Sequence, residues 1–517
     1  MHYTSQNPLV LIISSLLHGT VLIGTDTVQS ILSYSSYSLT FSDLKKSSLI
    51  HRSRCDKMIR RTWIAASKRS TTVSKTLEGI VGGSGHNRII ILGTGWGGYN
   101  LTRLLKDCDK EIRVVSPSNH FLFTPLLPST AVGTLEFRCI QEPIRTVLSP
   151  KNGAFVQAKA RSIDTESKTI ECESTFNNEK FSVNYDKLVI AVGVKTNTFG
   201  IESITEGDGV YFLKHLYHAR KIRNNIIDCF EKAAVPGTSK EERKRLLSFI
   251  VVGGGPTSCE FVSELHDFVT NDIQRHYRDM LPYVSVTLVE AGPSLLSTFD
   301  KNLQNYTQSL FENRDINVKL GCSVTGIEEY TDETFRFPAK RAVLGDGTKL
   351  PFGTFIWSAG LAPVKFTDNL DLPKAPNGRI LVDEFLRVKG HEDSIWALGD
   401  AAICETEPQP QLAQVARQQA IYLSKVFRGE QKADQEKFKF FNLGSMASVG
   451  EMKGIYDGSN VGVKGDTEIS VPKISGFLAL LMWRFAYWGR QTSIQNKFLI
   501  PMHWFKTLIF GRDISRF

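Results

Sequence analysis

Two glycine-rich motifs, 160 residues apart, constrain the fold of this chain more than any other feature. Each follows a run of apolar residues with β propensity, Ile89–Leu92 in the first case and Phe249–Val252 in the second. The motif residues are Gly93, Thr94, Gly95, Trp96, Gly97 and Gly98, then Gly253, Gly254, Gly255, Pro256, Thr257 and Ser258. In such a turn, backbone N–H groups approach a pyrophosphate at the start of a helix, whose dipole favours negative charge. The pair predicts two bound dinucleotides; the alternative is that the glycines only form tight strand-to-helix turns.

The composition is that of a globular protein with unusual ends. At 517 residues the chain can form two or three domains, and it contains 41% hydrophobic and 22% charged residues. The net charge of +9 gathers near the two ends, which favours targeting and membrane contact over nucleic-acid binding. The eight cysteines include no C-x-x-C pair, so no zinc site, metal ligand set or disulfide framework is predicted. No closely spaced cysteine pair follows the first motif, which excludes the internal redox disulfide of flavin disulfide reductases.

Residues 1–86 precede the first predicted strand and have the composition of a targeting segment. Between Met58 and His86 there are five basic residues and one acid, with frequent Ser and Thr, as in a mitochondrial presequence. The upstream run Leu9–Gly24 is largely apolar, but it lacks the basic residues that precede the apolar part of a secretory signal. We therefore expect Met58 to be the functional start, with residues 1–57 an upstream extension.

The segment Lys473–Phe517 has a different character. It contains seven basic residues, one acid and three of the seven tryptophans of the chain. Its uncharged run Ile474–Trp483 is half as long as the roughly 20 residues that span a bilayer. Aromatic and aliphatic residues mixed with cations favour helices that lie in the membrane interface. The alternative is a packing face for another subunit, and a homodimer is compatible with both uses.

Glu290 indicates which nucleotide the second motif binds. It ends the strand-like run Val284–Val289, where a carboxylate accepts both ribose hydroxyls of an adenosine. The same carboxylate would repel a 2′-phosphate, and Ala291–Pro293 offers no arginine, so NADH is predicted rather than NADPH. The alternative is an ordinary glutamate on a surface strand.

Two features depart from the usual pattern of the second motif. Ser258 takes the place of the third glycine, and Glu290 lies 37 residues after Gly253 instead of about 20. An insertion around Val269–Tyr283 would explain the longer spacing.

Asp400 is the better indicator of FAD at the first motif. The strand after that motif ends at Ser116 without an acid, and a serine would bind a ribose less strongly. The run Ile395–Leu398 is followed by Gly399 and Asp400, and in flavoproteins with two dinucleotides such a carboxylate reaches the ribityl hydroxyls. Read alone, Gly-Asp is an ordinary turn. Gly360 is also predicted to contact a cofactor.

Alternating strand-like and helical runs predict an α/β fold with two tandem Rossmann-like dinucleotide-binding domains. Further strands are expected at Leu188–Val192 and Thr354–Ser358. The FAD-binding domain is expected to be discontinuous, at residues 87–205 and 351–430, with the NADH-binding domain at 206–350 between its parts. Residues 431–517 then form a separate C-terminal region.

Six motifs carry a family resemblance. They are Gly93–Gly98, Phe121–Pro128, Gly253–Glu260, Ala397–Ala401, Ala413–Gln419 and Phe510–Phe517. With them the chain resembles, from about Asn87 to Phe517, the type II NADH dehydrogenases, which are single-subunit alternative NADH:quinone oxidoreductases of mitochondria and bacteria. The glycine motifs are shared by many flavoproteins, whereas the 121–128, 413–419 and C-terminal motifs are far more specific. The resemblance implies a glutathione-reductase-like flavoprotein fold, with residues 431–517 as the membrane-anchoring and quinone-site region.

The resemblance also implies roles for four side chains. Gln414 and Gln418 would border the quinone pocket, and their spacing places both amides on one helix face, where a donor could reach a quinone carbonyl. Glu260 matches a glutamate near flavin and nicotinamide, and Lys453 is a further pocket candidate. On spacing alone, the glutamines would face solvent and Glu260 would be an ordinary helix-start acid. Arg417 stands where some mitochondrial members have His, which leaves the proton route open.

The implied activity is hydride transfer from NADH to FAD, then transfer of two electrons to ubiquinone, as in rotenone-insensitive NADH dehydrogenases. No bundle of long apolar helices offers a proton path, so we expect no proton pumping. The implied location is the mitochondrial inner membrane, by peripheral (monotopic) association, with the matrix side favoured by the presequence. The alternatives are a sulfide:quinone oxidoreductase, a reductase with a soluble protein acceptor, and an NADH-binding flavoprotein of the apoptosis-inducing-factor kind.

Overall fold

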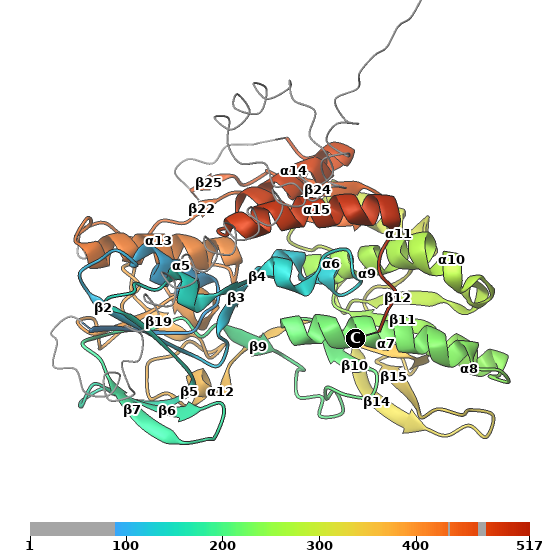
Figure 1. Cartoon of the computed structure of the whole chain (residues 1–517), viewed down its shortest axis with the longest axis horizontal. Helices are drawn as coiled ribbons and strands as arrows, with labels where there is room; N and C mark the ends of the chain where they lie inside the picture. The colour runs from blue at the N-terminus through green and yellow to red at the C-terminus, as the bar shows by residue number, and fades with distance from the viewer. Residues whose placement is uncertain (1–87, 433–434, 464–471, 517) are drawn as a thin grey trace, which may run out of the picture. The chain divides into compact units, whose positions relative to one another are not determined.

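The computed structural model describes residues 88–432, 435–463 and 472–516, which belong to one compact unit beginning at Leu77 (Figure 1). The predicted targeting segment and Met58 lie outside the described residues.

The first glycine motif lies in a seven-stranded sheet of order β20-β8-β1-β2-β5-β6-β7. Its strands are β20 (Ile395–Ala397), β8 (Lys187–Ile190), β1 (Arg88–Leu92), β2 (Glu111–Ser116), β5 (Gly153–Asp164), β6 (Thr169–Ser174) and β7 (Lys180–Asn184). The first five run parallel, and the last two extend the sheet as antiparallel strands. Every residue of β1 is buried, as an apolar strand covered on both faces should be. The strands predicted at 89–92, 188–192 and 395–398 and the strand predicted to end at Ser116 are confirmed.

The second glycine motif lies in a five-stranded parallel sheet of order β10-β17-β11-β12-β13. Its strands are β10 (Val210–Phe212), β17 (Thr354–Trp357), β11 (Ser248–Val252), β12 (Ser285–Val289) and β13 (Asn317–Lys319). A three-stranded antiparallel meander shares an apolar core with β11 and β12. The meander consists of β14 (Val324–Tyr330), β15 (Ala339–Leu344) and β16 (Lys349–Phe352). The strands predicted at 249–252, 284–289 and 354–358 are confirmed.

Two chain crossings, paired as the antiparallel strands β9 (Val194–Thr196) and β18 (Leu361–Pro363), connect the two sheets (Figure 1). The domain boundary expected between residues 350 and 351 lies inside β16, and β17 beyond it pairs with β11. The second sheet therefore extends to Trp357, because the segment that returns to the first sheet supplies one of its inner strands.

The insertion expected before Glu290 is helical. Helix α9 (Pro256–Phe268) continues into a π-helical turn at Val269–Ile273, followed by α10 (Gln274–His276) and a 3₁₀ turn at Arg278–Tyr283. These residues lengthen the connection from β11 to β12 while the two strands still pair in parallel.

The C-terminal region packs a small antiparallel sheet and two helices next to α9. Its elements are β23 (Ser445–Gly450), β24 (Lys453–Asp457), β26 (Ile474–Gly476), α14 (Phe477–Gly489) and α15 (Ile494–Phe510). Glu142, from the first sheet domain, accepts hydrogen bonds from Tyr99 Oη at 2.5 Å and from Ser493 N at 3.0 Å, so it holds the start of α15. Within the part of the chain that the structure describes, no helix has both the length and the apolar character to cross a bilayer.

The C-terminal motif after α15 is anchored by Arg512. Its guanidinium donates to Asp272 at 2.8 Å, to Glu264 at 3.0 Å and to Thr134 at 2.8 Å. Gly511 makes the turn into this site with φ +80°, a conformation that favours glycine. The motif thus joins α9 and the helical turn that follows it to the first domain, which contributes Thr134.

We expect Arg512→Ala to destabilise the protein by about 3–5 kcal/mol, because it leaves the buried carboxylates of Glu264 and Asp272 without their cation. The matched control is Arg516→Ala, since Arg516 is 67% exposed in its ion pair with Asp228 and should contribute only about 0–1 kcal/mol. Urea unfolding of both variants tests this expectation. Equal midpoints for the two variants would contradict it.

Candidate functional site

The predicted FAD residues come together at one edge of the first sheet. Gly93 follows β1, Ser116 ends β2 and Gly399 lies two residues beyond β20. Because β1, β2, β8 and β20 run parallel, their carboxyl ends share this edge, which is where α/β sheets bind ligands.

The glycines of the first motif have different surroundings. A Cβ atom on Gly98 would lie 2.0 Å from the carbonyl oxygen of Gly93, and one on Gly97 would lie 2.0 Å from Leu398 Cδ1. These two positions therefore require glycine for packing. A Cβ atom on Gly95 would meet nothing within 4 Å, so Gly95 faces open space at the start of α5 (Trp96–Leu104). No side chain caps this helix start, and its N–H groups are available to a phosphate.

Ser116 and Asp400 differ in whether their side chains already form hydrogen bonds within the described part of the protein. Ser116 Oγ lies 3.1 Å from Thr94 Oγ1 and accepts a hydrogen bond from Ser118 N at 3.2 Å. The Asp400 carboxylate has no hydrogen-bond partner among residues 88–432, 435–463 and 472–516, so both oxygens can accept bonds from a polyol. Burial raises the pKa of Asp400, and the charges of Lys214 and Arg379 lower it. Sequence reasoning missed Lys214 and Arg379, since neither belongs to a recognisable motif.

The second motif is arranged in the same way at the carboxyl edge of the second sheet. Glu290 accepts a hydrogen bond from Gly292 N at 2.6 Å and a second from Gly254 N, which fixes the carboxylate beside the motif. A Cβ atom on Gly255 would meet nothing within 4 Å, and α9 begins at Pro256 and Thr257 without a side-chain cap. This opening has the features of a second phosphate site.

Two further positions of this edge were predicted. Ser258, in the place of the third glycine, is fully buried, and its Oγ lies 2.5 Å from Ser358 Oγ. The Ser358 hydroxyl thus provides a hydrogen-bond partner for the hydroxyl that Ser258 has and a glycine would lack. Gly360 follows β17 with φ +72°, and a Cβ atom there would lie 2.6 Å from Phe199 Cζ, so the turn requires glycine.

Glu260 lies where α9 meets the C-terminal region. Its Oε1 accepts hydrogen bonds from Trp483 Nε1 at 2.9 Å and from Ser448 N at 3.2 Å, and the residue is 6% exposed. Burial raises the pKa of the carboxyl from 4.5 to about 8, against the lowering by these two hydrogen bonds. At neutral pH Glu260 is therefore mainly protonated, and it can donate or accept a proton near pH 7.

Aromatic side chains connect the first glycine motif to this carboxyl. The ring centroids of Trp96 and Phe123 are 5.1 Å apart, those of Phe123 and Tyr487 5.9 Å, and those of Tyr487 and Trp483 4.9 Å. Phe121 also packs on Trp96, at 5.0 Å. The 121–128 motif therefore bridges α5 and α14, a role that its sequence alone does not reveal.

The predicted quinone-site glutamines both contact one neighbouring segment. Gln418 exchanges hydrogen bonds with the backbone of Phe441, at 2.8 and 3.0 Å, and Gln414 accepts one from Leu443 N at 3.1 Å. They thus share one face of α13 (Ala413–Arg428), as predicted, but their amides hold the 441–444 backbone. Lys453 pairs with Glu451 at 2.9 Å.

Arg417 lies in a cationic environment. Burial lowers the pKa of its guanidinium, and the charges of Arg103 and Arg490 lower it further. An arginine at this position supplies a positive charge instead of a group that exchanges protons near neutral pH.

Comparison with protein families gives two matches. The family model "Pyridine nucleotide-disulphide oxidoreductase" matches residues 87–420, and the model "NDH2 C-terminal domain" matches residues 442–513. The second match covers the region that contains β23, β24, α14 and α15.

Individual relatives agree with this result. The chain is 41% identical over 442 residues to a probable NADH dehydrogenase of Dictyostelium discoideum, covering 84% of this chain and 92% of the relative. It is 38% identical to a mitochondrial internal alternative NAD(P)H-ubiquinone oxidoreductase A1 of Solanum tuberosum, covering 83% and 88%. Among solved structures, it resembles NDH2 from Plasmodium falciparum in complex with NADH, with a TM-score of 0.74 at 28% identity, covering 83% of this chain and 99% of that one.

The raised pKa of Glu260 makes stability depend on pH. The folded protein holds this proton up to about pH 8, whereas the unfolded chain loses it near pH 4.5, so the wild type should lose stability as pH rises between these values. Glu260→Gln keeps the side-chain shape without the ionisation, and its stability relative to the wild type should increase across this window. Thermal melting as a function of pH measures the difference. The exposed Glu202→Gln is the control, and a constant Glu260→Gln offset at all pH values would refute the expectation.

Proposed function

The chain belongs to the type II NADH dehydrogenase family and is an NADH:ubiquinone oxidoreductase that does not pump protons. From this starting point, we propose which of its residues bind FAD, NADH and ubiquinone. The observation that carries the proposal is the placement of α9. This helix begins at the second glycine motif and bears Glu260 one turn later, where the C-terminal region meets it.

The first sheet is proposed to hold FAD. The open position at Gly95 and the uncapped start of α5 receive the pyrophosphate, and the unpartnered carboxylate of Asp400 binds the ribityl hydroxyls. Gly93, Gly97 and Gly98 keep the turn tight enough for that approach. When bound, FAD accepts a hydride from NADH and passes two electrons on to ubiquinone.

The second sheet is proposed to hold NADH. Gly253, Gly255, Pro256 and Thr257 form the phosphate opening, and Glu290 is positioned to accept the ribose hydroxyls while its charge repels a 2′-phosphate. The two backbone N–H groups that bind Glu290 restrain the carboxylate before the nucleotide arrives, which lowers the ordering cost of binding.

We propose that ubiquinone is reduced between α13 and the C-terminal region. Glu260, protonated near neutral pH, supports the proton supply that quinone reduction needs. Gln414 and Gln418 shape this boundary by holding the 441–444 backbone, and Lys453 is placed at the start of β24. The fixed charge of Arg417 favours the negative charge that develops on a quinone.

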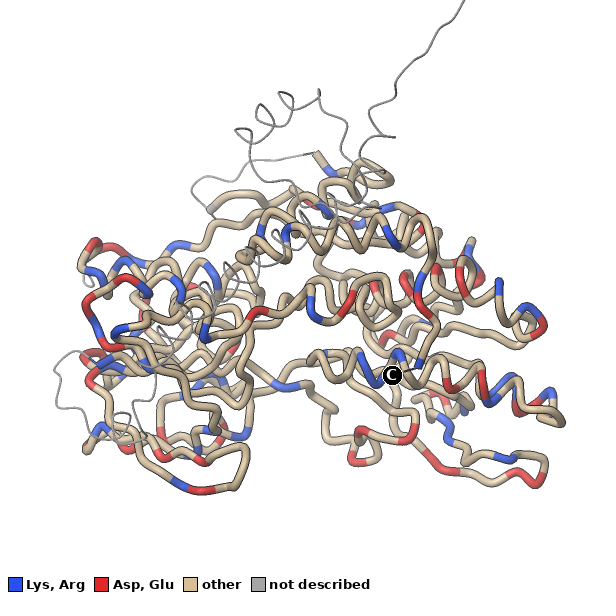
Figure 2. The backbone as a smooth tube through the Cα atoms, in the orientation of Figure 1, with Lys and Arg blue, Asp and Glu red and all other residues tan. Residues whose placement is uncertain are grey.

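Residues 431–517 are proposed to bind a membrane surface. The outer side of α14 and α15 carries large apolar side chains that are at least half exposed, namely Phe477, Leu478, Phe485, Ile494, Phe498, Met502, Phe505, Leu508, Ile509 and Phe510. The two helices contain no Asp or Glu and include Arg484, Lys497 and Lys506, and Figure 2 shows cations along them. Such a face fits a peripheral membrane contact with anionic lipid.

The proposed location is the mitochondrial inner membrane on the matrix side. Support comes from the presequence-like composition of residues 58–86 and from the relatives named as mitochondrial, which include both internal and external enzymes. Import of the full chain into isolated mitochondria, followed by protease protection, tests the assignment.

The Glu290 carboxylate should decide the choice of substrate. We expect the wild type, loaded with FAD, to oxidise NADH with a short-chain ubiquinone much faster than NADPH. In Glu290→Gln the charge that repels a 2′-phosphate is gone and a ribose acceptor is weakened, so the ratio of kcat/KM for NADH over NADPH should fall at least ten-fold. An unchanged ratio of kcat/KM for NADH over NADPH would show that Glu290 does not bind the ribose hydroxyls.

The apolar face predicts a measurable membrane affinity. Phe498 is 75% exposed on α15, and Phe498→Ser should weaken binding to vesicles of phosphatidylcholine and phosphatidylglycerol about ten-fold, because a large apolar side chain no longer enters the interface. Phe176→Ser is the control, since Phe176 is 80% exposed between β6 and β7 in another domain. Equal vesicle binding by both variants, with a stable dimer in solution, would assign the face to a second subunit instead.

A further inference from the structure

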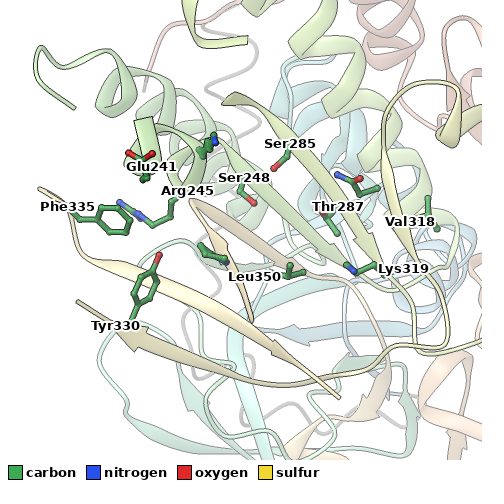
Figure 3. A pocket seen from close by; sticks show the side chains of 13 residues that line it. Glu241, Arg245, Ser248, Ser285, Thr287, Val318, Lys319, Tyr330, Phe335 and Leu350 are labelled. Atoms are coloured by element: carbon green, nitrogen blue, oxygen red, sulfur yellow. The ribbon is translucent and has the colours of Figure 1, made fainter. Parts of the chain in front are cut away.

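A cavity of about 600 Å³ lies at the amino ends of the strands of the second sheet (Figure 3). Ser248 is the first residue of β11 and Ser285 the first of β12, whereas Gly253 and Glu290 follow the last residues of these strands. The strands β11 and β12 are five residues long, so Ser248 and Ser285 lie roughly 13 Å from the strand ends that precede Gly253 and Glu290. The cavity nevertheless extends along the sheet to Lys319, the last residue of β13, whose carbonyl oxygen accepts a hydrogen bond from Glu290 N at 2.8 Å.

The sheet presents hydroxyl groups to this cavity. Ser248 pairs in register with Ser285, and Thr287 lies two residues further along β12 on the same face, as Figure 3 shows. None of these three hydroxyls has a hydrogen-bond partner within the described segments, and all three line the cavity. The inner strands of a parallel sheet are normally apolar. A row of hydroxyls on a cavity wall supplies donors and acceptors for a ligand that enters it.

The cavity has an excess of cations. Lys244 and Lys319 line it, and in the part of the chain that the structure describes neither forms an ion pair. Arg245 also lines it, but Glu242 lies 3.4 Å from its guanidinium, and Glu241 is the carboxylate at the cavity edge. Lysine ammonium groups and hydroxyls in one cavity are the donors that a phosphate group requires.

The opposite wall is aromatic. Tyr330, at the end of β14, and Phe335, in the following loop, line the cavity with their ring centroids 5.9 Å apart. Arg245 lies beside Phe335 (Figure 3), with its guanidinium 5.1 Å from the centre of the ring. Leu350 adds an aliphatic surface. The two rings pack edge to face on each other, and Arg341 lies 5.0 Å from the centre of the Tyr330 ring, so a planar group would contact this wall from the cavity side.

We propose that this cavity binds a nucleoside phosphate, with its phosphates at Lys244 and Lys319 and its base beside Tyr330 and Phe335. The row of Ser248, Ser285 and Thr287 accepts and donates hydrogen bonds to the phosphate or ribose oxygens. The volume is within the range of small-molecule sites. No lining residue belongs to either glycine motif.

The test is calorimetric titration of the FAD-loaded protein with ATP in the presence of saturating NAD⁺, which keeps adenosine out of the second glycine motif. We expect one saturable ATP site. Thr287→Val should raise the ATP Kd about ten-fold while leaving the melting temperature unchanged or higher, because the hydroxyl has no protein partner to lose. Lys319→Ala should also raise the Kd about ten-fold or more.

The control is Lys151→Ala, which removes the same charge from an exposed loop and should leave the ATP Kd unchanged. Absence of saturable binding with NAD⁺ present, or equal Kd values in wild type, Thr287→Val and Lys319→Ala, would overturn the proposal. If tripolyphosphate binds as tightly as ATP, the aromatic wall does not recognise a base and the assignment to a nucleoside phosphate is wrong.

Discussion

The attachment of α9 to the C-terminal region is the constraint on which the rest of the structure depends. The helix is held at two positions one turn apart, since Glu260 accepts hydrogen bonds from Trp483 and Ser448 while Glu264 binds Arg512. The same helix begins at the open glycine of the second motif. Helix α9 therefore links the C-terminal helices, with their apolar outer face, to the proposed NADH site.

This attachment also explains why a buried carboxyl is tolerated at Glu260. An ionised carboxylate would lose its hydration in this position, and two hydrogen bonds offset only part of that cost, so the group keeps its proton instead. Glu264, one turn later, is instead paired with a cation, because the Arg512 guanidinium lies 3.0 Å from its carboxylate. One helix thus carries a mainly protonated acid and, one turn later, a carboxylate in an ion pair.

Much of the fold could be predicted because its signals are local. The apolar runs before Gly93 and Gly253 specify the buried parallel strands β1 and β11. Asp400 follows β20 and Glu290 follows β12, which run parallel in the same two sheets, so both acids lie at the carboxyl edges that the glycine motifs occupy. The contacts of Arg512 could not be predicted, since its partners come from segments far away in the sequence. Helical spacing correctly placed the two motif glutamines on one face, but it could not show that a backbone segment occupies their amides.

The two edges of the second sheet show why a local sequence motif reveals one site and not the other. At the carboxyl edge the polar groups sit in a glycine turn, where a pattern reveals them. At the amino edge Ser248, Ser285 and Thr287 interrupt strands that read as ordinary β segments, and they meet the lysines only through the pairing of β11, β12 and β13. Unpaired hydroxyls at that position reduce the apolar burial that a sheet gains from its cover. Within residues 88–432, 435–463 and 472–516 these hydroxyls have no hydrogen-bond partner, and their common position on one cavity wall is visible only once the strand register is known.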